Sequence, residues 1–312
     1  MPPEFRKIIY GAALWGLKHP IGLQDIESTF KQARRIFNEA GFSREQCSVE
    51  MFAASEPRVD EQYAHAVRDA AREYNLIPIT MIFRPKASHS KSMVSHNKKS
   101  RREAVAQCNR GIDSAVIATP KALPILVNGP FQLVHGAGSS EVIGVKRSLY
   151  LADSLKHVAD KLEKVRAYAA LEPLRPSETK MPVSADFWLE MLDKVGSPRL
   201  GLLFDTVHFY EGNGGNPHVM LKDLDSVCKA GRCFGVHLSN SPSRVEWEPN
   251  GIARYTSKII QTIQRNHCNV TVDYEGFANC LDSLVGITRR PDQQNQEKVF
   301  ARSMAYLASK IN

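Results

Sequence analysis

The stretch Gly201-Leu-Leu-Phe-Asp-Thr-Val-His-Phe-Tyr210 starts as an uninterrupted apolar run and then turns polar. A short apolar run of this kind is typical of a parallel β-strand that is buried on both faces. Asp205 and His208 follow at the point where such a strand would leave the sheet. Enzymes with parallel sheets place their chemistry at this carboxyl end of the strands. The stretch therefore predicts a buried strand that delivers polar side chains to a functional site.

Seven further short apolar segments alternate with segments of helical periodicity. The predicted strands cover residues 8–15, 48–53, 77–83, 123–128, 168–172, 201–205, 233–237 and 269–275, and the predicted helices cover 23–40, 60–74, 101–118, 146–165, 184–195, 219–230, 252–266 and 295–310. Alternation of strands and helices indicates a parallel sheet. Eight repeats favour a closed (β/α)8 TIM barrel that occupies residues 1–312 as a single domain, with a doubly wound open sheet as the alternative.

Composition narrows the class of protein. Hydrophobic residues make up 43% of the 312, which is enough for a large core. We find neither a signal peptide nor an apolar run near the roughly 20 residues that a membrane span needs. The six cysteines form no CxxC pair and no zinc-finger spacing, as expected of reduced thiols. These features predict a cytoplasmic protein without a membrane partner.

The net charge of +8 is concentrated in one place. Residues 84–102 hold seven basic residues and no acidic one, so this segment accounts for all but one of the excess positive charges. We expect it to be a basic loop inserted between the third strand and the third helix, either as a flexible lid or as an anion-binding segment. A localised excess does not make a basic face, so a nucleic-acid partner is disfavoured.

Four polar residues stand at the carboxyl ends of the last four predicted strands. They are Glu172, Asp205, His237 and Glu275, separated by 33, 32 and 38 residues, which is about one strand–helix unit each. In a barrel these ends surround a single mouth. Three carboxylates that close together repel each other unless a cation lies among them. The oxygen-rich set predicts a divalent metal, with Mn²⁺ first and Mg²⁺ or Co²⁺ as alternatives; Zn²⁺ lacks a thiolate ligand here.

A structural role is the competing interpretation for each of these residues. A carboxylate after a strand is often the N-cap of the next helix, and a buried histidine is often only hydrogen-bonded. Four such residues in register on consecutive strands favour the metal site.

Several motifs around these residues resemble one known family. They are Leu171-Glu-Pro-Leu-Arg-Pro-Ser-Glu178, Phe204-Asp-Thr-Val-His208, Val236-His237 with Arg244 beyond, and Tyr274-Glu-Gly-Phe277. These motifs are similar to those of the xylose isomerase-like TIM barrels, and within them to the ketose 3-epimerases that act on tagatose and psicose. The specific resemblance covers roughly residues 165–280.

The resemblance implies an enzyme of carbohydrate metabolism and a role for each matching residue. Glu172, Asp205, His237 and Glu275 would bind Mn²⁺ or a similar ion, and the two glutamates would also transfer the proton at C3 of a ketose. Substrate contacts would come from His208, Glu178 and Arg244, and we add Trp15 as a candidate wall for the sugar. The resemblance also implies a homo-oligomer, a dimer or tetramer.

The chain departs from the family pattern at two places. Arg175-Pro-Ser177 replaces the usual Asn-Arg-aromatic sequence between the two glutamates, and Arg244 lies seven residues beyond His237 rather than six. Within the same fold, an isomerase, a dehydratase or a lyase that cleaves C-glycosides remains open as an alternative. An endonuclease-IV-like DNA repair enzyme is disfavoured, because the second and third strands end without the histidines that a trinuclear zinc site needs.

Overall fold

The computed structural model describes most of the chain. The described residues are 8–14, 22–42, 47–53, 61–82, 92–120, 123–128, 145–175, 181–240, 251–275 and 293–311. The predictions for Trp15, Glu178 and Arg244 lie outside these residues.

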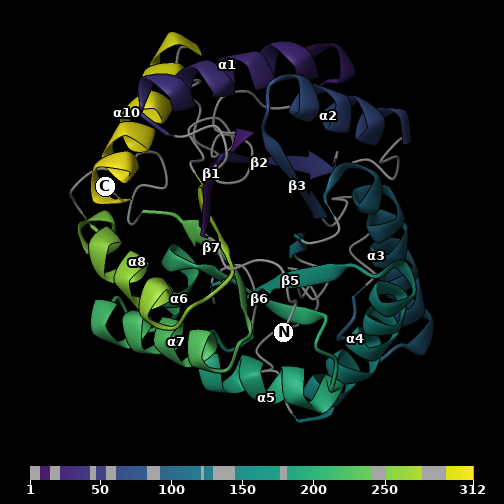
Figure 1. Cartoon of the computed structure of the whole chain (residues 1–312). Coiled ribbons are helices and arrows are strands. Elements are labelled where there is room, and N and C mark those ends of the chain that lie inside the picture. Colours follow the sequence, from purple (N-terminus) through teal and green to yellow (C-terminus); the bar gives the residue numbers. More distant parts are fainter. Residues whose placement is uncertain are drawn as a thin grey trace.

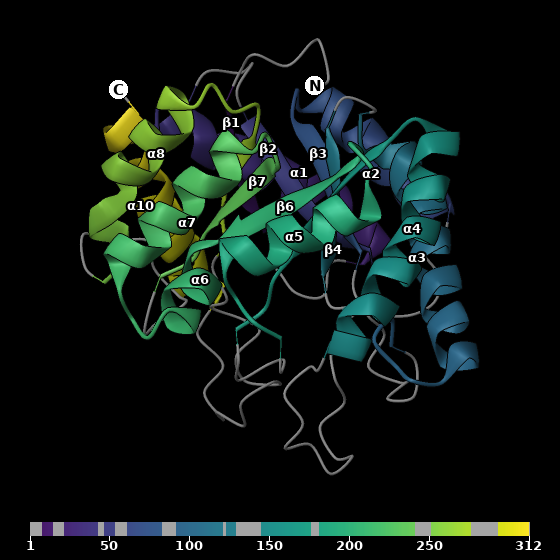
Figure 2. The ribbon, with the colours of Figure 1, turned by 90° about the horizontal axis from the view of Figure 1, so that it is seen from below.

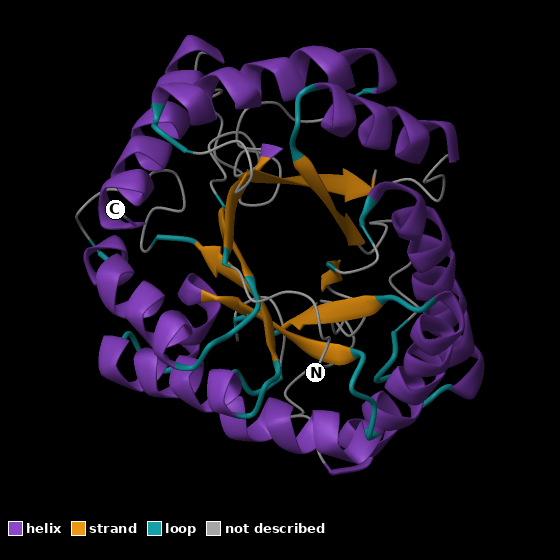
Figure 3. Cartoon of the chain, viewed as in Figure 1, coloured by secondary structure: helices purple, strands orange, loops and turns teal. Residues whose placement is uncertain are grey.

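Eight parallel strands form a closed barrel in which each strand pairs with its neighbours in chain order and β8 returns to β1. The strands are β1 (Ile9–Ala13), β2 (Cys47–Ala53), β3 (Ile77–Ile82), β4 (Pro124–Asn128), β5 (Tyr168–Glu172), β6 (Leu200–Asp205), β7 (Cys233–Leu238) and β8 (Thr271–Tyr274). Figure 3 shows them in orange inside a ring of helices. The predicted (β/α)8 TIM barrel is therefore confirmed, and the open sheet is excluded.

The helices surround the barrel, as Figure 1 shows along its axis and Figure 2 from the side. They are α1 (Ile26–Glu39), α2 (Glu61–Glu73), α3 (Lys98–Ala118), α4 (Val145–Val165), α5 (Ala185–Val195), α6 (Thr206–Gly212), α7 (Pro217–Lys229), α8 (Thr256–Arg265) and α10 (Gln293–Ile311), with short 3₁₀ turns η2 (Leu23–Asp25) and η4 (Ala253–Tyr255) before α1 and α8. Each helix presents an apolar stripe to the strands, so the main core lies between the helices and the barrel.

Two predicted boundaries differ from the structure. The sequence predicts a loop over 84–102, but α3 begins at Lys98, where the Asn97 side chain accepts hydrogen bonds from the backbone N–H groups of Lys99 and Ser100. This N-cap makes the last five residues of the segment helical. The chain after β6 also folds at once into the short helix α6, which apolar periodicity alone did not reveal.

The barrel interior is apolar at one end and polar at the other. A small separate cluster that includes Ile9, Ile79, Ala170 and Leu203 fills the apolar part. Gly11 on β1 borders the polar part, where a side chain at this position would collide with the Ser48 hydroxyl and the Asp273 carboxylate. Glycine is therefore required there so that Ser48 can donate its 2.5 Å hydrogen bond to Asp273.

A register shift lies close to the polar end. Along β6, the partner in β7 jumps from Cys233, opposite Leu202, to Gly235, opposite Leu203. Beyond this irregularity Asp205 pairs with His237. Bulges of this kind often redirect side chains next to functional sites. Here the shift brings two of the four predicted ligands to the same level.

Candidate metal centre

The barrel brings together the four residues predicted to bind a metal. Glu172 and Asp205 are the last residues of β5 and β6, His237 is the penultimate residue of β7, and Glu275 directly follows β8. Each of the four offers one ligand atom, and these atoms all lie within 4.8 Å of one another. All four side chains are buried, with 0 to 1% of each residue exposed. We refer to these four residues as the acidic centre.

The spacing inside the acidic centre fits a single ion. His237 Nδ1 lies 3.5 Å from an oxygen of Glu172, 3.5 Å from an oxygen of Glu275 and 4.0 Å from Asp205 Oδ2. Ligand atoms that bind one ion at roughly 2.1 Å in an octahedron lie about 3 to 4 Å apart. These separations are too long for strong direct hydrogen bonds but match the edges of a coordination shell.

Electrostatics gives a second reason to place a cation there. Two unit charges about 4 Å apart repel each other by about 4 kcal/mol at an effective dielectric constant of about 20. The three carboxylates meet at about this distance, and His237 Nδ1 forms no hydrogen bond with any residue that the structure describes. A nitrogen lone pair that faces carboxylates is stabilised only by a proton or a metal ion. The donor set of three carboxylates and one imidazole fits Mn²⁺, Mg²⁺ or Co²⁺.

Asp205 has two functions at once. Its Oδ1 accepts hydrogen bonds from the backbone N–H groups of Val207 at 2.7 Å and His208 at 3.1 Å, so it is the N-cap of α6. Its Oδ2 faces the acidic centre and accepts a 3.1 Å hydrogen bond from the Ser239 hydroxyl. Capping and metal binding, treated above as competing interpretations, are therefore compatible because they use different oxygens.

Ser239 and Thr206 hold the ends of the strands in place. The Ser239 hydroxyl also lies 2.8 Å from Glu275 Oε2, so it bridges two carboxylates of the acidic centre. Thr206 exchanges two hydrogen bonds with the Ser239 backbone, donating to its carbonyl at 2.8 Å and accepting from its N–H at 2.9 Å. All of these groups are buried, so the ligand side chains are oriented before any ion binds.

His208 lies at the edge of the acidic centre in the first turn of α6. Its Nδ1 accepts a 3.1 Å hydrogen bond from the backbone N–H of Arg175, which leaves the ring proton on Nε2. That Nε2 lies 3.5 Å from Glu172 and 3.9 Å from Asp205. Burial alone would raise the pKa of Glu172, but the neighbouring imidazoles of His208 and His237 outweigh it and lower that pKa below its ordinary value. His208 therefore presents a proton to the site, not a lone pair.

Glu50 is a buried partner of the acidic centre that sequence reasoning missed. Both of its carboxylate oxygens lie 2.9 Å from His237 Nε2. Burial raises the pKa of Glu50 to about 8, although His237 opposes this. Burial alone would lower the pKa of His237, but Glu50 and Glu275 outweigh it and raise that pKa well above 6.5. The only signal in the sequence was a charged residue in the middle of an apolar strand, Ser48-Val-Glu-Met-Phe52.

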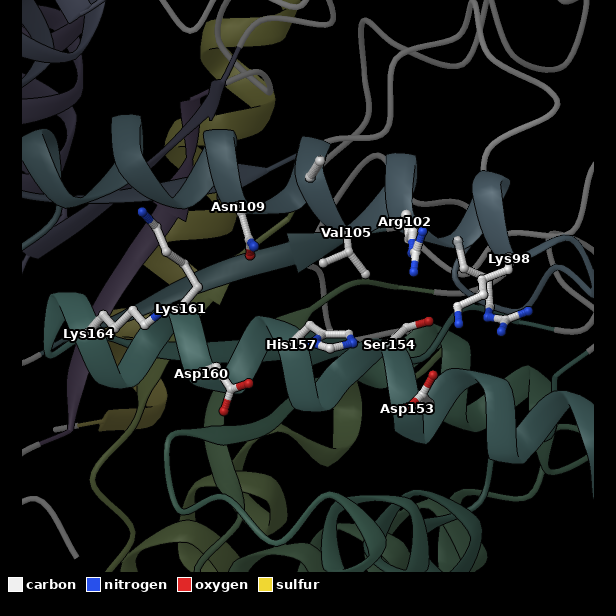
Figure 4. Close-up of a pocket in the computed structure, with 12 residues that line it drawn as sticks. Lys98, Arg102, Val105, Asn109, Asp153, Ser154, His157, Asp160, Lys161 and Lys164 are labelled. Atoms are coloured by element: carbon white, nitrogen blue, oxygen red, sulfur yellow. The ribbon is translucent and has the colours of Figure 1, made fainter.

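The described part of the basic segment lines a groove on the outside of the barrel, between α3 and α4 (Figure 4). The groove has a volume of about 670 Å³. Its lining residues are Lys98, Arg101, Arg102, Val105, Ala106 and Asn109 from α3 and Asp153, Ser154, His157, Asp160, Lys161 and Lys164 from α4. It shares no residue with the acidic centre, so this part of the segment does not reach into the barrel.

Two of the basic groups in this groove already have partners. Arg101 donates to the backbone carbonyls of Ser95 and His96, and Lys161 pairs with Asp113.

Among the helices that the structure describes, none combines the length and the apolar character that a membrane span requires.

Solved structures with the same fold include several sugar epimerases. D-psicose 3-epimerase from Clostridium cellulolyticum H10 superposes with a TM-score of 0.79 at 12% identity, covering 98% of this chain and 100% of the other. A 3-keto-D-glucoside 4-epimerase from E. coli gives a TM-score of 0.65 at 13% identity, covering 95% and 98%. A family 2 AP endonuclease from Brucella melitensis gives 0.63 at 14% identity, covering 86% and 93%. At these identities the likeness shows the fold alone.

Comparison with curated proteins finds no match. The family model described as the xylose isomerase-like TIM barrel matches residues 38–308, which is most of the chain. The chain therefore belongs to the xylose isomerase-like TIM barrel family.

Proposed function

We propose that this protein is a divalent-metal-dependent sugar epimerase that inverts the carbon next to a ketose carbonyl, C3. The observation that carries the proposal is the acidic centre, in which three carboxylates and one imidazole from β5 to β8 meet within 4.8 Å. Solved epimerases of free ketoses and of a keto-glucoside share the fold and support a carbohydrate substrate.

The acidic centre would hold Mn²⁺, with Mg²⁺ or Co²⁺ as alternatives, through Glu172, Asp205, His237 Nδ1 and Glu275. When bound, the ion supplies positive charge that makes the C–H next to a ketone carbonyl more acidic. Zn²⁺ is disfavoured because no thiolate belongs to the group.

Glu172 and Glu275 are the proposed acid and base. They come from β5 and β8, with the two other ligand strands between them, so they approach a substrate in the mouth from different sides. One glutamate removes the proton from C3 and the electron pair moves toward the carbonyl oxygen. The other glutamate returns a proton to the opposite face, which inverts the centre. A carboxylate that uses one oxygen for the ion keeps its second oxygen for this transfer.

His208 is the proposed donor to the substrate oxygen on which negative charge develops. Its Nε2–H faces the acidic centre, and the backbone N–H of Arg175 maintains this tautomer. A preorganised donor in a buried site contributes most when charge appears in the transition state. Glu178 and Arg244 remain proposed contacts to the substrate hydroxyls, and Trp15 a proposed wall for the sugar.

A keto-sugar lyase or dehydratase is the second candidate. The superposition on a 3-keto-D-glucoside 4-epimerase supports a keto-glycoside as an alternative substrate for the same proton abstraction. A nuclease is disfavoured, because the one group of metal-ligating residues that the described part of the chain brings together contains a single histidine. A DNA mobility shift that persisted at moderate salt would favour the nuclease instead.

Activity on a substrate panel tests the proposal. Protein stripped with a chelator would receive Mn²⁺, Mg²⁺ or Co²⁺ and then free ketoses, ketose phosphates or 3-keto-glycosides in D₂O. We expect a C3 epimer that carries one solvent deuterium, no product without metal, and no product from Glu172→Gln or Glu275→Gln. Full activity after chelation, or an epimer without deuterium, would contradict the proposed mechanism. A product from the keto-glycosides alone would favour the second candidate.

A further inference from the structure

We propose that Glu50 is a positioning residue that decides which nitrogen of His237 faces the acidic centre. The inference rests on the metal site of the proposed function but not on the substrate or the reaction. Glu50 lies on β2 and His237 on β7, which are not neighbours in the barrel, so their contact crosses the barrel interior.

The geometry of the contact defines its direction. Both carboxylate oxygens of Glu50 lie 2.9 Å from His237 Nε2, and both side chains are fully buried. A carboxylic acid would donate from one oxygen only, whereas the symmetric contact of both oxygens suits an ionised Glu50 that accepts from Nε2–H, so the proton of this contact lies on His237 Nε2. The other ring nitrogen, Nδ1, then lies on the side where Glu172 and Glu275 are 3.5 Å away, and it is the nitrogen that gives up its proton when an ion binds.

Chemistry supplies the reason for such a partner. An imidazole ligand needs one nitrogen free of protons, and a carboxylate behind the ring fixes the tautomer and makes the ligand nitrogen more basic. Without Glu50, the buried Nε2–H would lose its acceptor and the ring would gain freedom to turn. Glu50 would therefore act on the ion through His237, without touching the ion or a substrate.

A second buried acid allows a matched control. Asp273 is also fully buried in the barrel interior, close to Glu50, and it accepts its 2.5 Å hydrogen bond from Ser48. Asp273→Asn and Glu50→Gln each remove one carboxylate from this region. Only the Glu50 variant replaces an oxygen that contacts His237 Nε2, whereas the Asp273 variant removes a nearby negative charge and leaves that contact in place, so the pair separates orientation from the loss of negative charge.

The test is Mn²⁺ affinity measured by titration calorimetry on the full chain, with the thermal midpoint of the metal-free protein as the check of folding. We expect affinity to fall roughly 10-fold in Glu50→Gln, which keeps an acceptor oxygen, and roughly 100-fold in Glu50→Leu, which keeps none. Asp273→Asn should stay within about threefold of the wild type. If Glu50→Leu does not fold, Glu50→Gln carries the test.

Imidazole ¹⁵N spectra of the Mg²⁺-loaded protein give a second readout that a merely structural role would not move. We expect a protonated Nε2 on His237 in the wild type and a mixture of tautomers in Glu50→Leu. Unchanged affinity and tautomer in the Glu50 variants, or an equal loss in Asp273→Asn, would overturn the inference. A wild type that binds no metal would overturn both the inference and the proposed function, whereas metal binding without epimerase activity would overturn the proposed function alone.

Discussion

The two histidines of the site, His237 on β7 and His208 in α6, both lie within 4.0 Å of Glu172 and Asp205 but have opposite hydrogen bonding. His237 uses Nε2 to contact Glu50 and directs Nδ1 to the acidic centre. His208 uses Nδ1 to accept from the backbone N–H of Arg175 and directs Nε2 to Glu172. Both side chains are buried, so burial does not distinguish them.

The partner behind each ring makes the difference. Glu50 keeps a proton on His237 Nε2, so that Nδ1 is the nitrogen available to bind a metal ion. The backbone N–H of Arg175 needs a lone pair on His208 Nδ1, so the proton lies on Nε2, which can donate a hydrogen bond. Two residues of the same type therefore receive different proposed functions from groups that contact neither metal nor substrate.

The largest expected effect comes from Asp205→Asn, which tests whether the acidic centre that includes His237 binds a metal ion. Asparagine caps a helix about as well as aspartate, so α6 and the thermal midpoint of the metal-free protein should be preserved. The lost charge should weaken Mn²⁺ binding by at least about 100-fold, more than the loss of an outer hydrogen bond does. Titration calorimetry measures the affinity, and wild-type affinity in this variant would show that Asp205 is only a cap.

His208→Ala tests the proposed function of the second histidine as a hydrogen-bond donor. This variant should lower turnover and leave metal affinity nearly unchanged. We expect Mn²⁺ affinity within about threefold of the wild type and a fall in kcat of roughly 10²- to 10³-fold, as for other single donors to a developing oxyanion. Steady-state kinetics at saturating Mn²⁺ provides the measurement. Loss of the metal together with activity would mean that the two histidines do not differ in function.

The pH dependence of stability tests the contact between His237 and Glu50. The pKa of His237 is raised in the folded state, so the protonated imidazole stabilises the fold. This stabilisation is fully present below pH 6.5 and is lost as the pH rises through the folded-state pKa. The pKa of Glu50 is raised from 4.5 to about 8, so this carboxyl also costs stability as the pH rises between those values. Metal-free protein should therefore melt at a lower temperature at pH 9 than at pH 6.

Two controls accompany this melting experiment. Glu50→Gln should show a shallower decline with pH than the wild type, because one of the two titrating groups is gone. With Mn²⁺ present the trend should weaken or reverse, since deprotonated ligands bind the ion more tightly. A metal-free midpoint that rises from pH 6 to pH 9 would contradict the direction of both pKa shifts.

The smallest expected effect is that of Ser239→Ala, which removes the hydroxyl between Asp205 and Glu275. One hydrogen bond is worth about 1 kcal/mol, so Mn²⁺ affinity should fall roughly 2- to 10-fold. Ser154→Ala in α4 is the matched control, because its buried hydroxyl donates to the backbone carbonyls of Met93 and Tyr150, away from the acidic centre. Equal affinities in the two variants would mean that Ser239 does not orient the ligands.

Most of the fold and part of the site could be predicted from local patterns. Apolar runs of strand length separated by helical periodicity indicated all eight strands, and the polar residues that end β5 to β8 were all identified. The helix α6 was missed, because it is too short for a periodic signal and depends on the Asp205 cap. Glu50 was missed, because a charged residue in a buried strand does not reveal which group it contacts.

The sequence by itself determined that this chain forms a parallel barrel and that Glu172, Asp205, His237 and Glu275 lie at or next to the carboxyl ends of its last four strands. Strand periodicity and the polar exit of each strand are local properties, readable over fewer than about ten residues. Only the tertiary structure decided which nitrogen of each histidine faces the acidic centre. That choice depends on Glu50, 187 residues from His237, and on the Arg175 backbone, 33 residues from His208, which only the closed barrel brings into contact.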